Sequence, residues 1–304
     1  MKTTKKKKVT KRSVQLFLLT IPFMLLVVAF NYGPLLGWCY AFVEYRLGAS
    51  IWDMKFVGLD NFKRLVTEWP EISRVLRNTL VMSFLSLATS ILPVFFAILM
   101  NEIKNKHVRN VVQTVTTLPN FISWIVVYGI VFALFSNSGG VNILLKKIGI
   151  DFGSTGILGN IELTWVFQLF LQIWKGLGWG AIIYLAALSG IDESLYEAAE
   201  IDGANKFQRI CHITFPSVLP TYFVMLLISI GNILSNGFDQ FFVFYNALVS
   251  ERIEVLDYYV YKIGLVSGDF SYSIVVGMLK SLVSVALLFV ANTAAKKVRG
   301  EGII

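Results

Sequence analysis

Six long apolar segments, separated by shorter polar stretches, dominate the hydropathy pattern of the chain. They cover residues 14–42, 76–100, 111–135, 163–188, 219–243 and 273–294. Each is at least as long as the roughly 20 apolar residues that an α-helix needs to cross the hydrocarbon core of a bilayer. The pattern therefore predicts an all-α integral membrane protein with six transmembrane helices.

The composition agrees with a membrane protein. Of the 304 residues, 56% are hydrophobic and 15% are charged, and the mean hydropathy is +0.67. A soluble domain carries about 25% charged residues. The two cysteines, Cys39 and Cys211, and the two histidines have no metal-ligand spacing, so no metal site is expected.

The net charge of +8 comes largely from the N-terminus, which contains Lys2, Lys5, Lys6, Lys7, Lys8, Lys11 and Arg12. Such a run favours the cytoplasmic side and anionic lipid headgroups, so it does not require nucleic acid as a partner. We expect residues 1–13 to be a basic cytoplasmic N-terminus and residues 14–304 to be a single six-helix domain whose first helix is an uncleaved signal anchor.

The distribution of positive charge also predicts the orientation. With six spans, 15 lysines and arginines lie on the side of the termini and 10 on the opposite side. Since cytoplasmic loops carry the excess of positive charge, both termini are expected in the cytoplasm.

The loop at residues 190–220 is the one long polar interruption whose sequence has an organised pattern of helix-capping signals. Asp192 is a good N-cap for a short helix that Gly203 would end. Asn205 and Gln208 form a capping-box pattern for a second short helix, which then meets Pro216 and Pro220. The loop is acidic although it is expected in the cytoplasm, which favours a partner surface over a simple connection.

This loop resembles the EAA loop of bacterial ABC importer permeases, and the flanking sequence resembles carbohydrate permeases of the MalF/LplB type. The resemblance implies the type I importer fold, in the bacterial cell membrane, with a coupling helix that docks on a cytoplasmic ATPase. The matching positions are Glu197, Ala198, Ala199, Asp202, Gly203, Ala204 and Pro216.

The same resemblance implies the partners. They are a second, homologous permease, two ATPase subunits and an extracellular solute-binding lipoprotein that delivers an oligosaccharide. ATP and Mg²⁺ would bind to the ATPases, so this chain is expected to need no cofactor. Whether the permease pair is a heterodimer or a homodimer stays open, although a heterodimer is more common in this group.

Polar side chains within the apolar segments are candidates for the substrate pathway, because such residues face the bundle interior or a water-filled path. One helical face of the fourth segment is expected to carry Gln168, Gln172, Lys175 and Trp179. One face of the fifth is expected to carry Asn232, Asn236, Asp239 and Gln240, and the sixth contains Lys280.

Amides and carboxylates suit sugar hydroxyls, and aromatic rings suit the C–H faces of a sugar. The rings that could serve are Trp174, Trp179, Phe238, Phe241, Phe242 and Tyr245. The alternative is that these polar residues only join helices, at ~0.6 kcal/mol for each hydrogen bond. Lys175 and Lys280 in particular suit a structural ion pair or a side chain that reaches to the membrane interface. If they face the cavity, they favour an acidic or strongly polar glycan.

The sequence contains no Walker A motif, no GxSxG motif and no metal-ligand cluster, so we expect a transport subunit and no enzyme. The competing hypothesis is a secondary sugar transporter or channel that works without an ATPase. A membrane scaffold or sensor subunit is a further alternative, which the polar faces of the fourth and fifth segments disfavour.

Overall fold

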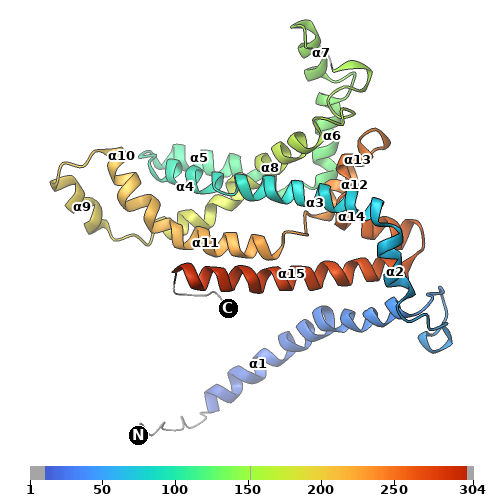
Figure 1. Ribbon diagram of the computed structural model, residues 1–304. Helices are drawn as coiled ribbons and strands as arrows, with labels where there is room; N and C mark the ends of the chain where they lie inside the picture. The colour runs from blue at the N-terminus through green and yellow to red at the C-terminus, as the bar shows by residue number, and fades with distance from the viewer. Residues whose placement is uncertain (1–10, 151, 300–304) are drawn as a thin grey trace. The chain divides into compact units, whose positions relative to one another are not determined.

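The computed structural model describes residues 11–150 and 152–299, and these residues are almost entirely helical (Figure 1). Within them, β pairing is limited to one isolated bridge between Val43 and Phe56. Six helical segments in this part of the chain are long and apolar enough to cross a membrane: Val14–Phe42, Trp69–Asn101, Trp124–Lys147, Thr164–Leu188, Lys206–Gly231 and Phe270–Lys297. The predicted all-α fold with six spans is therefore confirmed.

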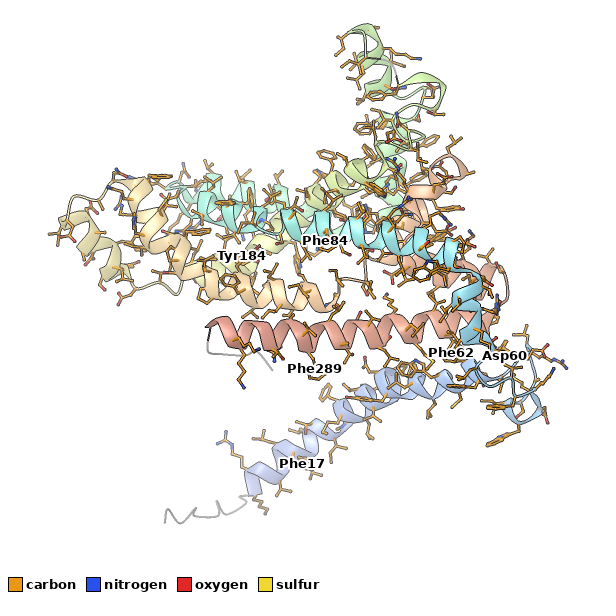
Figure 2. The ribbon with its side chains drawn as sticks, viewed as in Figure 1. Phe17, Asp60, Phe62, Phe84, Tyr184 and Phe289 are labelled. Atoms are coloured by element: carbon orange, nitrogen blue, oxygen red, sulfur yellow. The ribbon has the colours of Figure 1, made fainter. Side chains whose placement is uncertain are left out.

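Large apolar side chains cover the outside of these helices, as expected for surfaces that contact lipid. Phe17, Phe84 and Phe289 project from three different helices and are each about 60% exposed (Figure 2). In water such faces would be an aggregation hazard, whereas in a bilayer they match the surrounding solvent.

The chain divides into two compact units. The first contains residues up to Thr67 together with Lys262–Met278. Its elements are α1 (Lys11–Val27), a π-helical turn η1 (Val28–Tyr32), η2 (Gly33–Phe42), η3 (Ile51–Asp53), α2 (Asp60–Thr67), η8 (Lys262–Val266) and the start of α15 (Phe270–Arg299). Most of the predicted basic N-terminus, residues 1–10, lies outside the described residues.

Side-chain contacts hold this first unit together. Arg64 pairs with Asp269 at 2.6 Å and lies 4.1 Å above the ring of Tyr272. The Ser271 hydroxyl donates to the Val43 carbonyl at 2.7 Å. These contacts connect the segment after the first span to the N-terminal end of the last helix.

The second unit contains the remaining helices, beginning with α3 (Trp69–Thr89) and α4 (Leu92–Asn101). These are followed by α5 (Lys106–Thr117), η4 (Leu118–Phe121), α6 (Trp124–Phe135), α7 (Gly140–Lys147), η5 (Gly153–Thr155) and α8 (Thr164–Leu188). The rest comprises α9 (Glu193–Ile201), α10 (Lys206–Arg209), η6 (Ile210–Thr214), α11 (Phe215–Gly231), α12 (Phe238–Phe244), η7 (Ala247–Val249), α13 (Ser250–Ile253), α14 (Leu256–Tyr261) and the remainder of α15.

Helix α8 is the packing centre of this unit. A Cβ atom on Gly178 would lie 2.3 Å from the carbonyl oxygen of Thr116, so only glycine allows α8 to approach α5 this closely. One apolar cluster joins Leu171 of α8 to Met82 and Phe241, and a second joins Ala181 and Tyr184 to α4 and α11.

Three of the expected spans are interrupted: the second only by the two residues between α3 and α4, and the third and fifth by longer segments. The third was expected at residues 111–135, but α5 ends at Thr117 and α6 begins only at Trp124. Pro119 lacks an N–H group, and Ser123 caps α6 by accepting from the Val126 amide, so the chain changes direction here. The membrane-length segment in this region is accordingly Trp124–Lys147.

The fifth span was expected at residues 219–243, but α11 ends at Gly231 and α12 begins at Phe238. The Asn232 side chain donates back to the Ile228 carbonyl at 3.0 Å, and Gly237 has a φ of 87°, which favours glycine. The expectation that Asn232, Asn236, Asp239 and Gln240 share one helical face was therefore wrong, because an irregular segment separates them.

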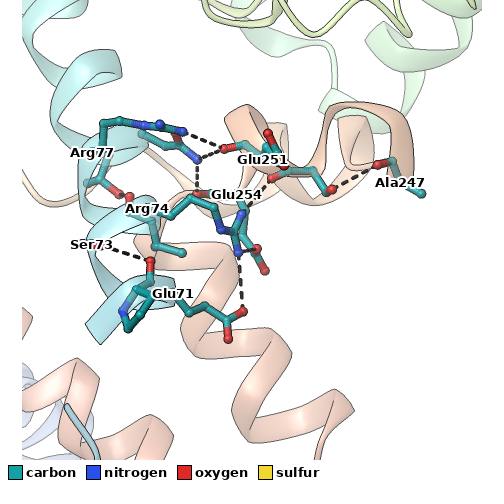
Figure 3. A network of polar contacts seen from close by, with 12 residues as sticks. Glu71, Ser73, Arg74, Arg77, Ala247, Glu251 and Glu254 are labelled. Carbon is teal, nitrogen blue, oxygen red and sulfur yellow. Dashed lines mark hydrogen bonds and ion pairs between the residues drawn. The ribbon is translucent and has the colours of Figure 1, made fainter. Parts of the chain in front are cut away.

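A charged network joins the start of α3 to α13 and the segment after it (Figure 3). The Glu254 side chain is 1% exposed, and the Arg74 guanidinium lies 2.6 Å from its carboxylate. Arg74 also donates to the Ser250 carbonyl at 3.1 Å, and Asn78 donates to the carbonyl oxygens of Glu251 and Glu254. The carboxylate is therefore buried together with its counter-charge.

Because removal of one partner leaves a buried charge, we predict that Arg74→Met lowers the free energy of unfolding by about 3 kcal/mol. Adding Glu254→Gln should restore part of this loss. The matched control is Arg46→Met, since Arg46 and Glu44 are 65% and 53% exposed and 3.7 Å apart, and such pairs contribute little. Thermal unfolding in detergent measures all three variants; equal losses for Arg74→Met and Arg46→Met would contradict the network's role.

Candidate functional site

A groove runs along α8 where it faces α3, α4, α11 and the irregular segment after α11. It consists of three adjoining cavities of about 240, 280 and 270 Å³, and the side chain of Gln172 lines all three. Ser86 and Ser229 belong to the first two cavities, and Asn236 belongs to the last two. We call these three cavities the central groove.

Six of the nine predicted pathway residues line the central groove: Gln172, Lys175, Asn232, Asn236, Asp239 and Gln240. Two of them offer acceptor atoms, because Gln172 Oε1 and Asn236 Oδ1 are buried and accept no hydrogen bond from the part of the chain that the structure describes. Buried acceptors of this kind suit a ligand that brings hydroxyl donors. The break in the fifth span thus places polar residues at the groove although they do not share a helix face.

The groove also contains hydroxyl groups that the sequence analysis missed. They come from Ser83, Ser86, Thr89, Ser90, Tyr184, Tyr222, Ser229 and Ser235. The serines at positions 83, 86 and 90 follow steps of three and four, which places them on one face of a helix. This spacing could have identified the serines as groove residues. A serine within a span is weaker evidence for a ligand site than an amide, because its hydroxyl can bond to a carbonyl of its own helix.

The irregular segment between α11 and α12 is held by Asp257 of α14. Its carboxylate accepts from the backbone amides of Asn236 at 2.9 Å and Gly237 at 3.2 Å. Lys280 of α15 donates to the same carboxylate, and the two side chains are 20% and 15% exposed. Lys280 therefore forms the ion pair that was one of its two expected roles, and it is absent from the residues that line the groove.

Lys175 stabilises the other break, the turn between α5 and α6. Its ammonium group donates to the carbonyl oxygens of Pro119 at 3.0 Å, Asn120 at 2.8 Å and Ile122 at 2.7 Å. A lysine has three N–H donors, so these carbonyls use all of them. Lys175 lines the groove, but its hydrogen bonds serve the backbone.

The remaining two pathway candidates lie elsewhere. Trp179 contacts the ring of Phe121 edge to face at 5.7 Å. Gln168 is 3% exposed and accepts a hydrogen bond of 2.6 Å from the amide of Gln240, and it lines a separate cavity. Among the predicted aromatic platforms, Phe238 lines the groove, whereas Phe241 is 1% exposed within the core.

The acidic loop forms the two short helices that its capping signals predict. The Asp192 carboxylate accepts from the Ser194 backbone amide at 3.0 Å, and this bond lowers the pKa of Asp192. Gly203 has a φ of 74° after α9, and Asn205 and Gln208 bond each other's backbone amides in a capping box. The caps are therefore confirmed.

The second short helix does not stop at the prolines. It continues from α10 through the π-helical turn η6 into α11, so Pro216 and Pro220 lie within one long helical segment. A π-turn shifts the hydrogen-bond register, with the Phe215 amide bonding to the Ile210 carbonyl, just before Pro216, which has no amide to donate.

The loop exposes apolar side chains between its carboxylates. Ile201 is 87% exposed, Phe207 is 73% exposed and Leu195 is 49% exposed. Glu193, Glu197, Glu200 and Asp202 are also exposed around them. Exposed apolar residues with a charged rim are typical of a protein docking surface.

We predict that Lys175→Met lowers the free energy of unfolding by about 2 kcal/mol, since three intramembrane hydrogen bonds of ~0.6 kcal/mol each are lost. Lys106→Met, at the exposed start of α5, is the control and should have no effect. Thermal unfolding in detergent is the measurement. Unchanged stability of Lys175→Met would show that the lysine does not hold the turn.

Comparisons with known proteins agree with this architecture. Residues 89–300 match the family of binding-protein-dependent transport system inner membrane components. The chain is 37% identical to Protein LplB of Bacillus subtilis (strain 168), over 96% of this chain and 92% of the relative. It is also 37% identical to the polygalacturonan/rhamnogalacturonan transport system permease protein YteP of the same organism, over 99% of this chain and 95% of the relative.

Among solved structures, the chain is similar to a bacterial ABC transporter involved in the import of the acidic polysaccharide alginate. The TM-score is 0.84 at 32% sequence identity, over 95% of this chain and 97% of that chain. The chain is also similar to a bacterial alginate ABC transporter in complex with an alginate pentasaccharide-bound periplasmic protein. Here the TM-score is 0.85 at 32% sequence identity, over 96% of this chain and 98% of that chain. The chain belongs to the family of binding-protein-dependent transport system inner membrane components and has the fold of an ABC importer permease.

Proposed function

We propose that this chain is a permease subunit of an ATP-driven importer that carries oligosaccharides delivered by an extracellular solute-binding protein. The observation that carries the proposal is the central groove, which presents unsatisfied amide acceptors and several hydroxyls along α8. Sugars bind through many hydroxyl hydrogen bonds, and such a lining matches that chemistry. The relatives with sugar-related names support the same substrate class.

The proposed assembly adds a second permease, two ATPase subunits and a solute-binding lipoprotein in a bacterial cell membrane. Both termini and the α9–α10 loop would lie in the cytoplasm. ATP and Mg²⁺ would bind to the ATPases, and their closure would move α9 and, through η6, the long helix that lines the groove. The groove would then be exposed alternately to the two sides.

The coupling role of the loop rests on its exposed surface. Residues Glu197, Ala198, Ala199, Asp202, Gly203, Ala204 and Pro216 are proposed to form or position the ATPase contact. In the described structure Ile201 is 87% exposed, so replacing its side chain would remove few contacts within the chain itself. A secondary transporter would not require such a surface.

We predict that Ile201→Ser reduces co-purification of the ATPase and oligosaccharide-stimulated ATP hydrolysis while the melting temperature stays unchanged. Leu47→Ser is the matched control, because Leu47 is 84% exposed and belongs to the segment after the first span. Affinity purification from native membranes, followed by an ATPase assay in nanodiscs, gives both readouts. An importer that transports without any ATPase would favour the secondary-transporter hypothesis.

The groove leads to a separate prediction. Gln172→Leu should lower oligosaccharide uptake by about tenfold, the effect of losing about 1.4 kcal/mol of substrate interaction. Trp174→Leu, on the same helix and absent from the residues that line these cavities, is the control.

Uptake of a radiolabelled oligosaccharide in proteoliposomes that contain the complete importer measures both variants. Equal uptake by Gln172→Leu and wild type would place the substrate outside the groove.

A further inference from the structure

A further cavity, with a lining of apolar and uncharged polar side chains, lies at the opposite end of α8 from the α9–α10 loop. Its volume is about 410 Å³, within the range of roughly 300–1,000 Å³ that is typical of small-molecule sites. Thr164, the first residue of α8, lines it, whereas the loop follows the last residue, Leu188. A helix of 25 residues separates the two ends by roughly 37 Å, so they lie at opposite faces of a membrane.

Aromatic rings form the apolar part of the lining. Phe132 lines the cavity and is 53% exposed, and Tyr128 and Phe167 also line the cavity. The ring of Tyr128 packs edge to face against Phe244 at 5.1 Å, which fixes its orientation. Exposed ring faces at a fixed position suit the C–H face of a sugar ring.

The polar part is built around Gln168, which is 3% exposed. Its Oε1 accepts from Gln240 at 2.6 Å, and the Gln168 carbonyl accepts from the same nitrogen at 3.0 Å. This pair fixes the amide so that Nε2 is the remaining donor, and no hydrogen bond from Nε2 is found within residues 11–150 and 152–299, although this nitrogen is not one of the fully buried atoms that lack a partner. An amide donor that lines the cavity and has no protein acceptor is available to a ligand that supplies one.

The lining contains amides and hydroxyls but no lysine, arginine, aspartate or glutamate within the described residues. A charged ligand would therefore enter without a counter-charge, which is costly. The lining is also distinct from the central groove: Gln168 belongs to this cavity, Gln240 belongs to the groove, and their hydrogen-bonded amides lie between the two.

We propose that this cavity is a second saccharide site, which holds one or two neutral sugar residues against Phe132 with a sugar hydroxyl accepting from Gln168 Nε2. The inference rests on the proposed function, because it assumes that the chain meets saccharides. With the cytoplasmic loop at the other end of α8, the site opens on the outer side, so a saccharide occupies it before it enters the groove.

Cysteine reporters test this site in the full chain in lipid nanodiscs. Cys39 and Cys211 are both exposed and are first replaced by serine. Ser138→Cys then reports on the second cavity, and Ser229→Cys reports on the central groove, because each residue is exposed and lines its own cavity. The rate of maleimide modification is measured with maltose, cellobiose, galactobiose or digalacturonate as the probe.

We expect at least one neutral disaccharide to slow modification at position 138, by roughly tenfold at ten times its Kd, since only the unliganded site reacts. Digalacturonate should have no effect at position 138. Adding Phe132→Ala should abolish protection at position 138 and leave any protection at position 229 unchanged.

Two results would overturn the inference. Protection at position 229 without protection at position 138 would remove the second site and leave the proposed function intact. Slow modification at position 138 that depends on lipid and not on saccharide would mean that an acyl chain fills the cavity. If no saccharide protects either position and the assembled importer takes up no saccharide, the proposed function itself would instead be refuted.

Discussion

Inside a bilayer every backbone amide and carbonyl needs a partner within the protein, and this requirement explains how the groove is built. The third and fifth expected spans have the longer interruptions, and each of these frees backbone groups at the groove. Lys175 donates to three carbonyls at the first break, and Asp257 accepts two amides at the second. Lys175 and Asp257 are therefore hydrogen-bond partners of the irregular backbone, although charged side chains within a span would by themselves suggest contacts with a ligand.

This arrangement leaves ligand binding mainly to uncharged groups, with the Asp239 carboxylate as a charged group that also lines the groove. Lys280 neutralises Asp257, and Lys175 uses its three donors on the backbone, so the amides and hydroxyls of the groove remain for hydrogen bonds. The irregular segment at Asn236 and Gly237 connects α11, which continues from the acidic loop, to α12 beside the core. A movement of α10 would thus reach the groove through the continuous helix of α10, η6 and α11, while the breaks keep the polar lining of the groove in place.

The sequence predicted the parts that depend on local chemistry. Asp192, Gly203 and the Asn205–Gln208 pair have the caps that their residue types favour, because capping needs only a few neighbouring residues. The six spans follow from hydropathy. The break at residues 232–237 was missed because the apolar residues on both sides extend the hydropathy peak, although two asparagines and Gly237 weaken a helix there. The pairing of Lys280 with Asp257 joins residues 23 positions apart and required the structure.

The most direct test is a structure of the assembled importer with an oligosaccharide trapped inside. We predict sugar density beside Gln172 and Asn236, with Lys175 still bound to the turn at Pro119 and Asp257 still bound to the amides of Asn236 and Gly237. Density for a sugar bound to the Lys175 ammonium or the Asp257 carboxylate, with the backbone bonds broken, would contradict this prediction.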